Sequence, residues 1–385
     1  MTALPASAQQ QAPSYDERLK NGTRFDKTMN AATIGVLTEP VGGTSVRLTA
    51  DLAYEFDRHG QLRLLPMIGK GAVQNVAEII YLKGVDVSIV QSDALEYYRN
   101  SLWGGVDESI RYITSMYDHE VHILARRDVG SLSDLAGKKV NLDLLGSGSQ
   151  LTGSTIFERL GIPIEVVSVD QERALAMLGC GEIAAAVMVS GKPVGPLGRI
   201  LREEQASELH LLDVPPVPQL LATYRPARLT HDDYPGLVAP DEVVDTVAVR
   251  SVMAVFNWPA NSDRYARVAR FVESFFAGID GLQAAPYRHP KWREVDIRAD
   301  VPGWTRFKPA QDWLRQNPPV LTPLTADEDE DPVLTQAFET FLHERAPQLH
   351  RRLSAQERDR LFREFQAWRG DDGTRAEAGD DVRSQ

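Results

Sequence analysis

Residues 33–56 read TIGVLTEPVGGTSVRLTADLAYEF and decide the fold. The apolar run at 33–37 predicts a short strand, and the two adjacent glycines after it predict a turn. Apolar residues then recur at helical spacing from Val46 to Phe56, so we expect a helix with one buried face. A strand, a turn and a helix in this order form the repeating unit of a parallel sheet with crossover helices.

The same unit recurs along the chain. An apolar strand at 62–67 precedes a second helix, and alternating residues at 85–89 predict a third strand. The pattern restarts with strands predicted at 139–144, 165–169 and 183–189. The strand at 183–189 does not alternate apolar with polar residues, which is typical of buried strands in parallel sheets. Two α/β units, and therefore two lobes, are expected.

Three further strands connect the units. Strands predicted at 110–115 and 121–125 run antiparallel to the others or cross between the lobes, and a run at 247–256 returns the chain to the first lobe. The predicted organisation is a signal-peptide remnant or disordered lead-in at 1–30, lobe 1 at 31–126 and 247–326, lobe 2 at 127–246, a helical extension at 327–370 and a disordered tail at 371–385.

Composition narrows the class of protein. The chain has 385 residues and a formal net charge of −12, whereas nucleic-acid binders need a basic face, so we expect no nucleic-acid partner. No apolar stretch approaches the roughly 20 residues of a membrane span, so direct membrane insertion is not expected. The single cysteine, Cys180, is expected to be a small buried filler. Ala6-Ser7-Ala8 is typical of the cleavage end of a secretory signal and predicts export, with the true start upstream.

Four turns each follow the carboxyl end of a predicted strand and precede a helix, at 41–45, 91–93, 146–152 and 190–192. Ligands bind at this edge of open parallel sheets. Helix N-termini there present unpaired N–H groups and a positive dipole end, which suit carboxylate or phosphate oxygens. The candidate ligand-binding residues are Gly42, Gly43, Thr44, Ser45, Gln91, Ser92, Asp93, Gly146, Ser147, Gly148, Ser149, Thr152, Ser190 and Lys192.

The turn at 146–152 is the strongest of these elements. Its glycines let the backbone approach a ligand closely, and its hydroxyls supply hydrogen bonds without fixed charge. No Gly-Lys-Ser/Thr follows at P-loop spacing. Ordinary helix capping is the alternative explanation for Ser147 or Ser149 and for the turn at 91–93. Lys192 and Lys70 are candidate partners for an anion, and the alternative for both is an ordinary surface lysine.

Catalytic groups do not assemble from the sequence. His119 and His122 have a spacing that suggests a metal site, but side chains three apart on a strand point to opposite faces. Neither a Gly-x-Ser-x-Gly elbow nor a zinc-type cysteine pair is present. We therefore predict no catalytic residue, no metal and no cofactor.

Several stretches together resemble the TAXI-type solute-binding subunits of TRAP transporters. They are the glycine turn at 41–44, the segment 85–93 that ends Val-Gln-Ser-Asp, the lead at 133–140 into Gly-Ser-Gly-Ser at 146–149, the run at 181–187 and Ser-Gly-Lys-Pro at 190–193. The similarity covers roughly residues 33–315. It implies a type II periplasmic-binding-protein-like fold with crossing linker strands.

The resemblance also implies a role. Such a protein captures an organic acid or amino acid, such as glutamate, in the periplasm and delivers it to a membrane permease powered by an ion gradient. Two features depart from the family: Glu39 lies in the first loop, which lacks the expected aromatic residue, and the extension after Asp327 has no counterpart.

Two other hypotheses stay open at this point. In one, the chain is a ligand-modulated sensory or scaffold subunit, whose C-terminal helices engage a partner through Phe362, Phe365 and Trp368. In the other, it is an enzyme on the same two-lobed fold. Under the solute-binding reading, two lobes close around the ligand and contacts from both sides stabilise the closed state.

Overall fold

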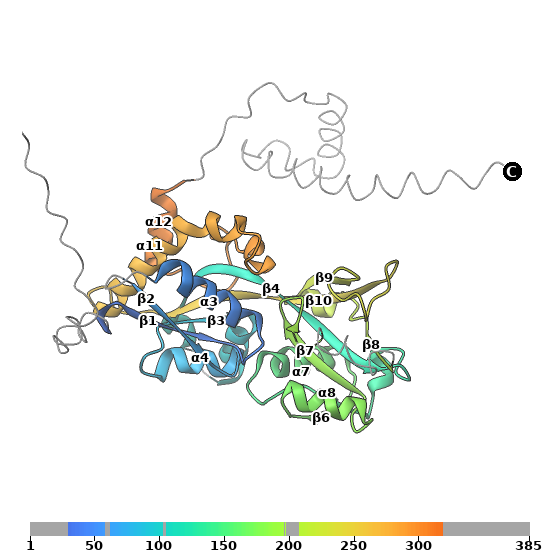
Figure 1. Cartoon of the computed structure of the whole chain (residues 1–385). Coiled ribbons are helices and arrows are strands. Elements are labelled where there is room, and N and C mark those ends of the chain that lie inside the picture. The colour runs from blue at the N-terminus through green and yellow to red at the C-terminus, as the bar shows by residue number, and fades with distance from the viewer. Residues whose placement is uncertain (1–29, 58–61, 103–104, 196, 198–207, 319–385) are drawn as a thin grey trace, which may run out of the picture. The chain divides into compact units, whose positions relative to one another are not determined.

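The computed structural model describes residues 30–57, 62–102, 105–195, 197 and 208–318 (Figure 1). All of them belong to one compact unit, Met1–Pro318. The predicted lead-in up to residue 29, the helical extension at 327–370 and the tail at 371–385 lie outside the described residues. The predicted lobe boundaries stay a prediction.

One mixed sheet runs through this unit, in the strand order β2-β1-β3-β10-β4-β7-β5-β6, with β8 beside β4 and β9 beside β10. At one end, β1 (Thr33–Thr38) pairs in parallel with β2 (Arg63–Ile68) and β3 (Val87–Gln91). At the other end, β5 (Lys139–Asn141) pairs in parallel with β6 (Glu165–Val167) and β7 (Ala185–Ser190). The α/β, two-lobed fold is confirmed.

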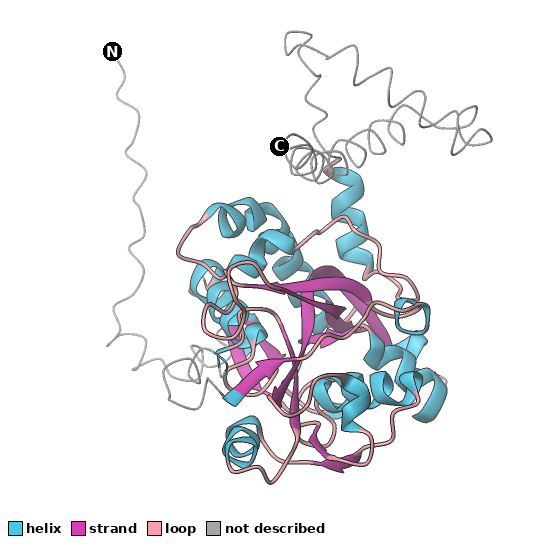
Figure 2. Ribbon diagram, turned by 90° about the vertical axis from the view of Figure 1, so that its right-hand side faces the viewer, coloured by secondary structure: helices cyan, strands magenta, loops and turns pink. Residues whose placement is uncertain are grey.

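Helices cover the sheet of the first lobe on both faces (Figure 2). The long α11 (Asp263–Ala284) begins at Ser262, whose hydroxyl accepts from the Tyr265 N–H, and packs its phenylalanines against α3 (Thr44–Phe56). A second core forms around α4 (Ala72–Tyr81). The remaining helical segments of this lobe are α5 (Asp93–Tyr97), a π-helical turn at Tyr98–Leu102, α6 (Val106–Ser109), η4 (Pro290–Glu294) and α12 (Lys308–Gln316).

The second lobe repeats this plan. Ser147 caps α7 (Gly148–Leu160) by accepting from the Gln150 N–H, and Asp170 caps α8 (Gln171–Gly179) in the same way. Both helices pack on β7, and two apolar cores result. The other elements of this lobe are η2 (Leu132–Leu135), α10 (Pro218–Leu221), β8 (Leu209–Leu211) and β9 (Arg225–Thr230).

Two long strands join the lobes. The strand β4 (Ile110–Arg126) and its antiparallel neighbour β10 (Val243–Phe256) each pass from one core to the other (Figure 1). On β4, residues up to Tyr117 pack in the first lobe and residues from Val121 onward pack in the second. These strands are the crossing linkers that the resemblance implied.

The prediction of two separate strands at 110–115 and 121–125 was wrong. The polar residues between them interrupt the apolar pattern, yet each has a partner within the fold. Asp118 pairs with Arg250, His119 with Glu39 and Glu120 with Lys291. Because these partners come from distant parts of the chain, the sequence pattern alone could not show that one strand continues.

Candidate ligand-binding site

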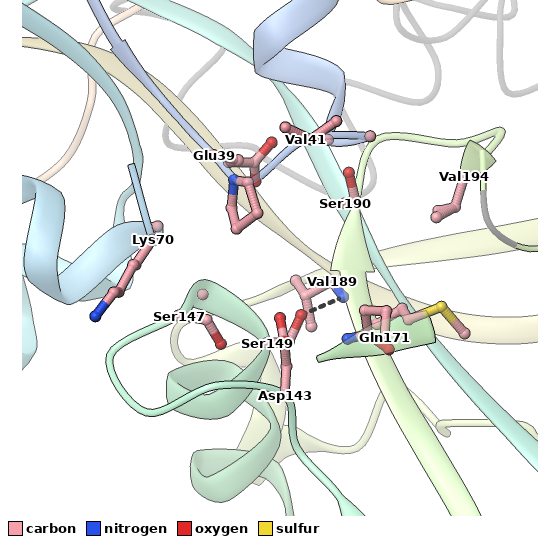
Figure 3. Close-up of a pocket in the computed structure, with 16 residues that line it drawn as sticks. Glu39, Val41, Lys70, Asp143, Ser147, Ser149, Gln171, Val189, Ser190 and Val194 are labelled. Carbon is pink, nitrogen blue, oxygen red and sulfur yellow. Dashed lines mark hydrogen bonds between the residues drawn. The ribbon is translucent and has the colours of Figure 1, made fainter. Parts of the chain in front are cut away.

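A pocket lies where the loop after β1 meets the first turn of α7 and the end of β7 (Figure 3). Its volume is about 90 Å³. One wall comes from lobe 1 and the other from lobe 2. It is lined by Glu39, Pro40, Val41, Gly42, Gly43, Lys70, Gly71, Asp143, Ser147, Gly148, Ser149, Gln171, Met188, Val189, Ser190 and Val194.

The start of α7 supplies the clearest set of hydrogen-bond donors in the pocket. Ser147 already satisfies the Gln150 N–H, and the earlier N–H groups of the first turn have no partner within the helix. The Ser149 hydroxyl accepts from the Val189 N–H at 3.0 Å, which fixes the helix start against β7. This terminus therefore offers backbone donors and a positive dipole end to an anion.

The start of α3 differs, because a carboxylate of the chain itself already lies on it. Glu39 Oε2 is 3.3 Å from the Ser45 N–H, and the Glu39 N–H donates to Ser45 Oγ at 2.9 Å. A Cβ atom at Gly43 would lie only 2.8 Å from Glu39 Oε2, so glycine leaves the space that the carboxylate fills. The lobe 1 wall thus presents an acceptor as well as a helix terminus.

His119 lies beside Glu39 and forms a buried pair with it. Its Nδ1 is 3.1 Å from Glu39 Oε1, and its ring stacks on Tyr117 at a centroid distance of 4.7 Å. Burial opposes charge on both groups, but their mutual attraction outweighs it, so the pKa of His119 is raised and the pKa of Glu39 is lowered. Each group therefore favours the charged form of the other.

The lobe 2 wall carries two further acceptors. Asp143 has a φ of 72°, the left-handed region that non-glycine residues rarely adopt, and burial raises the pKa of its carboxyl group. The Gln171 amide donates to the Val187 carbonyl at 3.1 Å, and its buried Oε1 has no partner among the described residues. In Figure 3, Asp143 and Gln171 lie beside Ser149, whereas the Lys70 ammonium is directed away from them.

The structure brings six of the predicted residues to this pocket: Gly42, Gly43, Ser147, Gly148, Ser149 and Ser190. Their contact with a ligand stays a prediction. Gly146 lies just outside, with a φ of 86°, and its carbonyl accepts from the Gln74 N–H across the lobes.

Thr44, Ser45 and Lys192 are engaged elsewhere. The Thr44 hydroxyl donates to the Gly191 carbonyl of lobe 2 at 2.8 Å, and Ser45 holds Glu39 as described above. The Lys192 ammonium lies 2.8 Å from Asp233 Oδ2, and the Lys192 N–H donates to Glu120. The cation predicted to meet an anion from the second lobe is therefore not among the pocket-lining residues.

Gln91, Thr152 and Asp93 form a buried polar chain between the lobes. Thr152 Oγ1 lies 3.4 Å from Gln91 Oε1 and 2.8 Å from Asp93 Oδ2. The Tyr224 hydroxyl approaches the same aspartate oxygen at 3.4 Å. Burial raises the pKa of Asp93 to about 6, because these hydrogen bonds compensate desolvation only in part.

Two larger cavities, of about 470 and 510 Å³, are lined in part by α5, and both include Asp93. Ser92 lines the second of them rather than the pocket beside α7. The predicted turn at 91–93 thus contributes to the contact between the lobes and to these cavities.

Sequence reasoning missed Asp143 and Gln171 as pocket residues. A signal existed for both: Asp143 closely follows a strand, and Gln171 opens the helix after the next one. Asp143 was missed because the strand was predicted to extend over 139–144, which placed this residue inside it. The strand ends at Asn141, and the chain turns there.

The two histidines of β4 contact different partners. His122 Nε2 is 2.7 Å from the Tyr234 hydroxyl, whereas His119 pairs with Glu39. Within the described ranges no group of three or more His, Cys, Asp or Glu could hold a metal ion. Cys180, predicted to be buried, is exposed at the end of α8, where the chain leaves the helix. Among the helices of the described residues, none is long and apolar enough to cross a membrane.

Comparisons with known proteins find one family and several solved structures to which the chain is similar. The model of the NMT1-like family matches residues 40–266. A mutant of ArgBP from T. maritima has 14% identity and a TM-score of 0.40, covering 66% of this chain and 93% of its own. A TctC solute binding protein from Polaromonas has 15% identity and a TM-score of 0.36, with coverages of 65% and 88%. XAC2383 from Xanthomonas citri bound to ATP has 12% identity and a TM-score of 0.41, with coverages of 68% and 87%.

Proposed function

The chain belongs to the NMT1-like family, whose model matches more than half of it, and we propose that it is a binding protein that captures a small carboxylate-bearing solute between its lobes. The single observation that carries this proposal is the pocket at the start of α7, which both lobes line. Unpaired N–H groups and the helix dipole favour a carboxylate there.

The electrostatics of the pocket support an anion at α7 rather than elsewhere. Lys70 is the only basic residue among the described residues that line the pocket, and it lies on the rim. Two acidic residues, Glu39 and Asp143, also line the pocket, and its remaining polar side chains are the neutral Ser147, Ser149, Gln171 and Ser190. A carboxylate at α7 gains the donors of the helix and lies on the wall opposite Glu39.

Capture follows from movement of the lobes about β4 and β10. Contacts such as Thr44 to Gly191 and Thr152 to Asp93 join lobe 1 to lobe 2 directly. A ligand that touches both walls adds to these contacts only when the lobes are closed, so it shifts the population toward the closed form. The proposal involves no chemical reaction.

We further propose that the protein is exported to the periplasm and delivers its ligand to a TRAP-type permease. The motifs at 85–93, 133–140 and 146–149 that resemble TAXI-type subunits support this proposal. The proposal therefore includes both a permease partner and an export signal.

Thermal unfolding of the full chain against a panel of small organic acids and amino acids tests the binding role. A ligand at about 100 times its Kd adds roughly 2.7 kcal/mol to the free energy of unfolding, which raises the Tm visibly. Calorimetric titration then gives the affinity of each hit. If no carboxylate shifts the Tm of the folded protein, the carboxylate proposal is wrong.

A further inference from the structure

The start of α3 differs from the start of α7 in one respect that bears on ligand choice. Both helices begin at the pocket; the side chain of Ser147 caps α7, whereas Gly43 at the N-cap of α3 has no side chain to do so. On α3, however, Glu39 Oε2 lies at the Ser45 N–H, where the carboxylate of a ligand would otherwise lie. The chain thus places a carboxylate on an N–H group of α3, whereas the cap of α7 is the neutral hydroxyl of Ser147.

The charge of Glu39 faces the pocket. Glu39 lines the pocket, whereas its counterion His119 does not and lies on the far side of the carboxylate. The ion pair therefore presents its negative end to a ligand. Gly43 keeps this geometry possible, since a side chain there would displace the carboxylate.

Acceptors face Glu39 from the other lobe. Asp143 is buried, and Gln171 Oε1 cannot exchange with Nε2 without losing the bond from Nε2 to the Val187 carbonyl. A buried acceptor without a partner is unfavourable, so this wall favours a ligand that donates hydrogen bonds. A second carboxylate on the ligand would place its oxygens, which only accept hydrogen bonds, beside the acceptor oxygens of this wall.

We infer that Glu39 determines specificity: the pocket takes a small monocarboxylate that carries hydroxyl or ammonium donors, and Glu39 excludes dicarboxylates. This inference rests on the proposed function and narrows its ligand class. The single carboxylate lies at α7, and the donors face Glu39, Asp143 and Gln171. A dicarboxylate would have to place its second charge at the start of α3, where Glu39 already lies.

Calorimetric titration of the full chain with two sets of probes tests the inference. L-serine, L-lactate and D-glycerate are the donor-bearing monocarboxylates, and succinate and L-malate are the dicarboxylates. We expect the unmodified protein to bind at least one of the first set and to bind the second set at least about tenfold more weakly, since like charges a few ångströms apart repel strongly at a partly buried site. In Glu39→Gln, the ratio of the affinity for the monocarboxylates to the affinity for the dicarboxylates should fall by about tenfold or more.

One further variant serves as a control, and another replaces Glu39→Gln if that variant does not fold. Glu273→Gln removes an exposed charge on α11 and should leave the ratio unchanged. If Glu39→Gln fails to fold, the double variant Glu39→Gln with His119→Gln leaves no unpaired buried charge and should narrow the ratio likewise.

The outcomes separate the two proposals. Equal binding of both sets by the unmodified protein, or an unchanged ratio in the Glu39 variants, overturns the role of Glu39 and leaves the binding role standing. Binding of neither set overturns the inferred ligand class, and the thermal panel of organic acids and amino acids then decides whether the binding role stands.

Discussion

Asp93 is a carboxyl group that the fold holds in an unfavourable environment. It is 6% exposed, and its Oδ2 accepts from Thr152 while its buried Oδ1 has no partner among the described residues. Because desolvation disfavours the charged form, its pKa is raised from 3.8 to about 6. The folded state therefore holds this proton more tightly than the unfolded state does.

Asp93→Asn should change how stability depends on pH. In the unmodified protein, the contribution of Asp93 is greatest below pH 3.8 and is lost as the pH rises to about 6, because the unfolded state ionises first. The variant has no carboxyl group at this position, so its stability does not fall in this way as the pH rises. Its free energy of unfolding relative to the unmodified protein should thus rise by about 2 kcal/mol between pH 4 and pH 8. Urea unfolding at both pH values measures the difference, and an equal difference at both would contradict the raised pKa.

The sequence located the turns of the site but not the direction of their side chains. Ser147 and Ser149 were found because a helix start after a strand is a local pattern. Lys192 was misplaced because its partner, Asp233, lies 41 residues away, and no local pattern shows that this carboxylate reaches it first. Glu39 was noted as an unexpected charge, yet its place on α3 depends on the space that Gly43 leaves.

At the scale of elements, the start of α7 lies directly against β3 of the other lobe. A Cβ atom at Gly148 would lie 2.4 Å from Gln91 Oε1 and 2.6 Å from Gln91 Cδ. Gln91 is not free to move away, because its amide contacts His119 and Thr152 and the residue is buried. This close approach of α7 to β3 exists only while the lobes are closed.

Gly148→Ala should therefore lower ligand affinity more than it lowers stability. The added methyl group collides with Gln91 in the closed form, whereas each lobe folds around its own core without this contact. We expect a loss of affinity of about tenfold or more, measured by titration, since removing the clash requires the lobes to separate.

The matched control is Gly281→Ala on α11, where nothing lies within 4 Å of the added atom. That change should raise the free energy of unfolding by about 0.5 to 1 kcal/mol through helix propensity and leave affinity unchanged. Equal effects of the two substitutions on affinity would show that the α7 contact does not control closure.

Regular elements were predictable where a single face is buried. Helical spacing identified α3 and α4, and apolar runs identified β1, β2 and β7. The short strands β8 and β9 were missed, because β8 has three residues and β9 places arginine and proline at an edge of the sheet. Their pairing with the long strands β4 and β10 stabilises them, and local propensity does not show it.

For the whole molecule, a few polar contacts join the two lobes, and the proposed balance between open and closed forms depends on them. Thr44 Oγ1 donates to the Gly191 carbonyl, the Lys192 N–H donates to Glu120 beside Lys291, and Thr152 reaches Asp93. No large apolar surface is needed for these contacts, so closure can be reversible while each lobe stays folded. The order of lobes along the chain was predictable, but these contacts were not, because they join residues from 59 to 147 positions apart.

Thr44→Val tests this balance directly, and Thr49 on the same helix provides the control. Valine keeps the shape of Thr44 but leaves the Gly191 carbonyl without its donor, which weakens the closed form by about 1 kcal/mol. Ligand affinity should fall about fivefold, and small-angle scattering should show a larger radius of gyration without ligand. Thr49 is equally buried, but its hydroxyl has no partner among the described residues, so Thr49→Val should change neither quantity. If both substitutions open the molecule alike, the effect comes from packing within α3, and the hydrogen bond between the lobes does not set the balance.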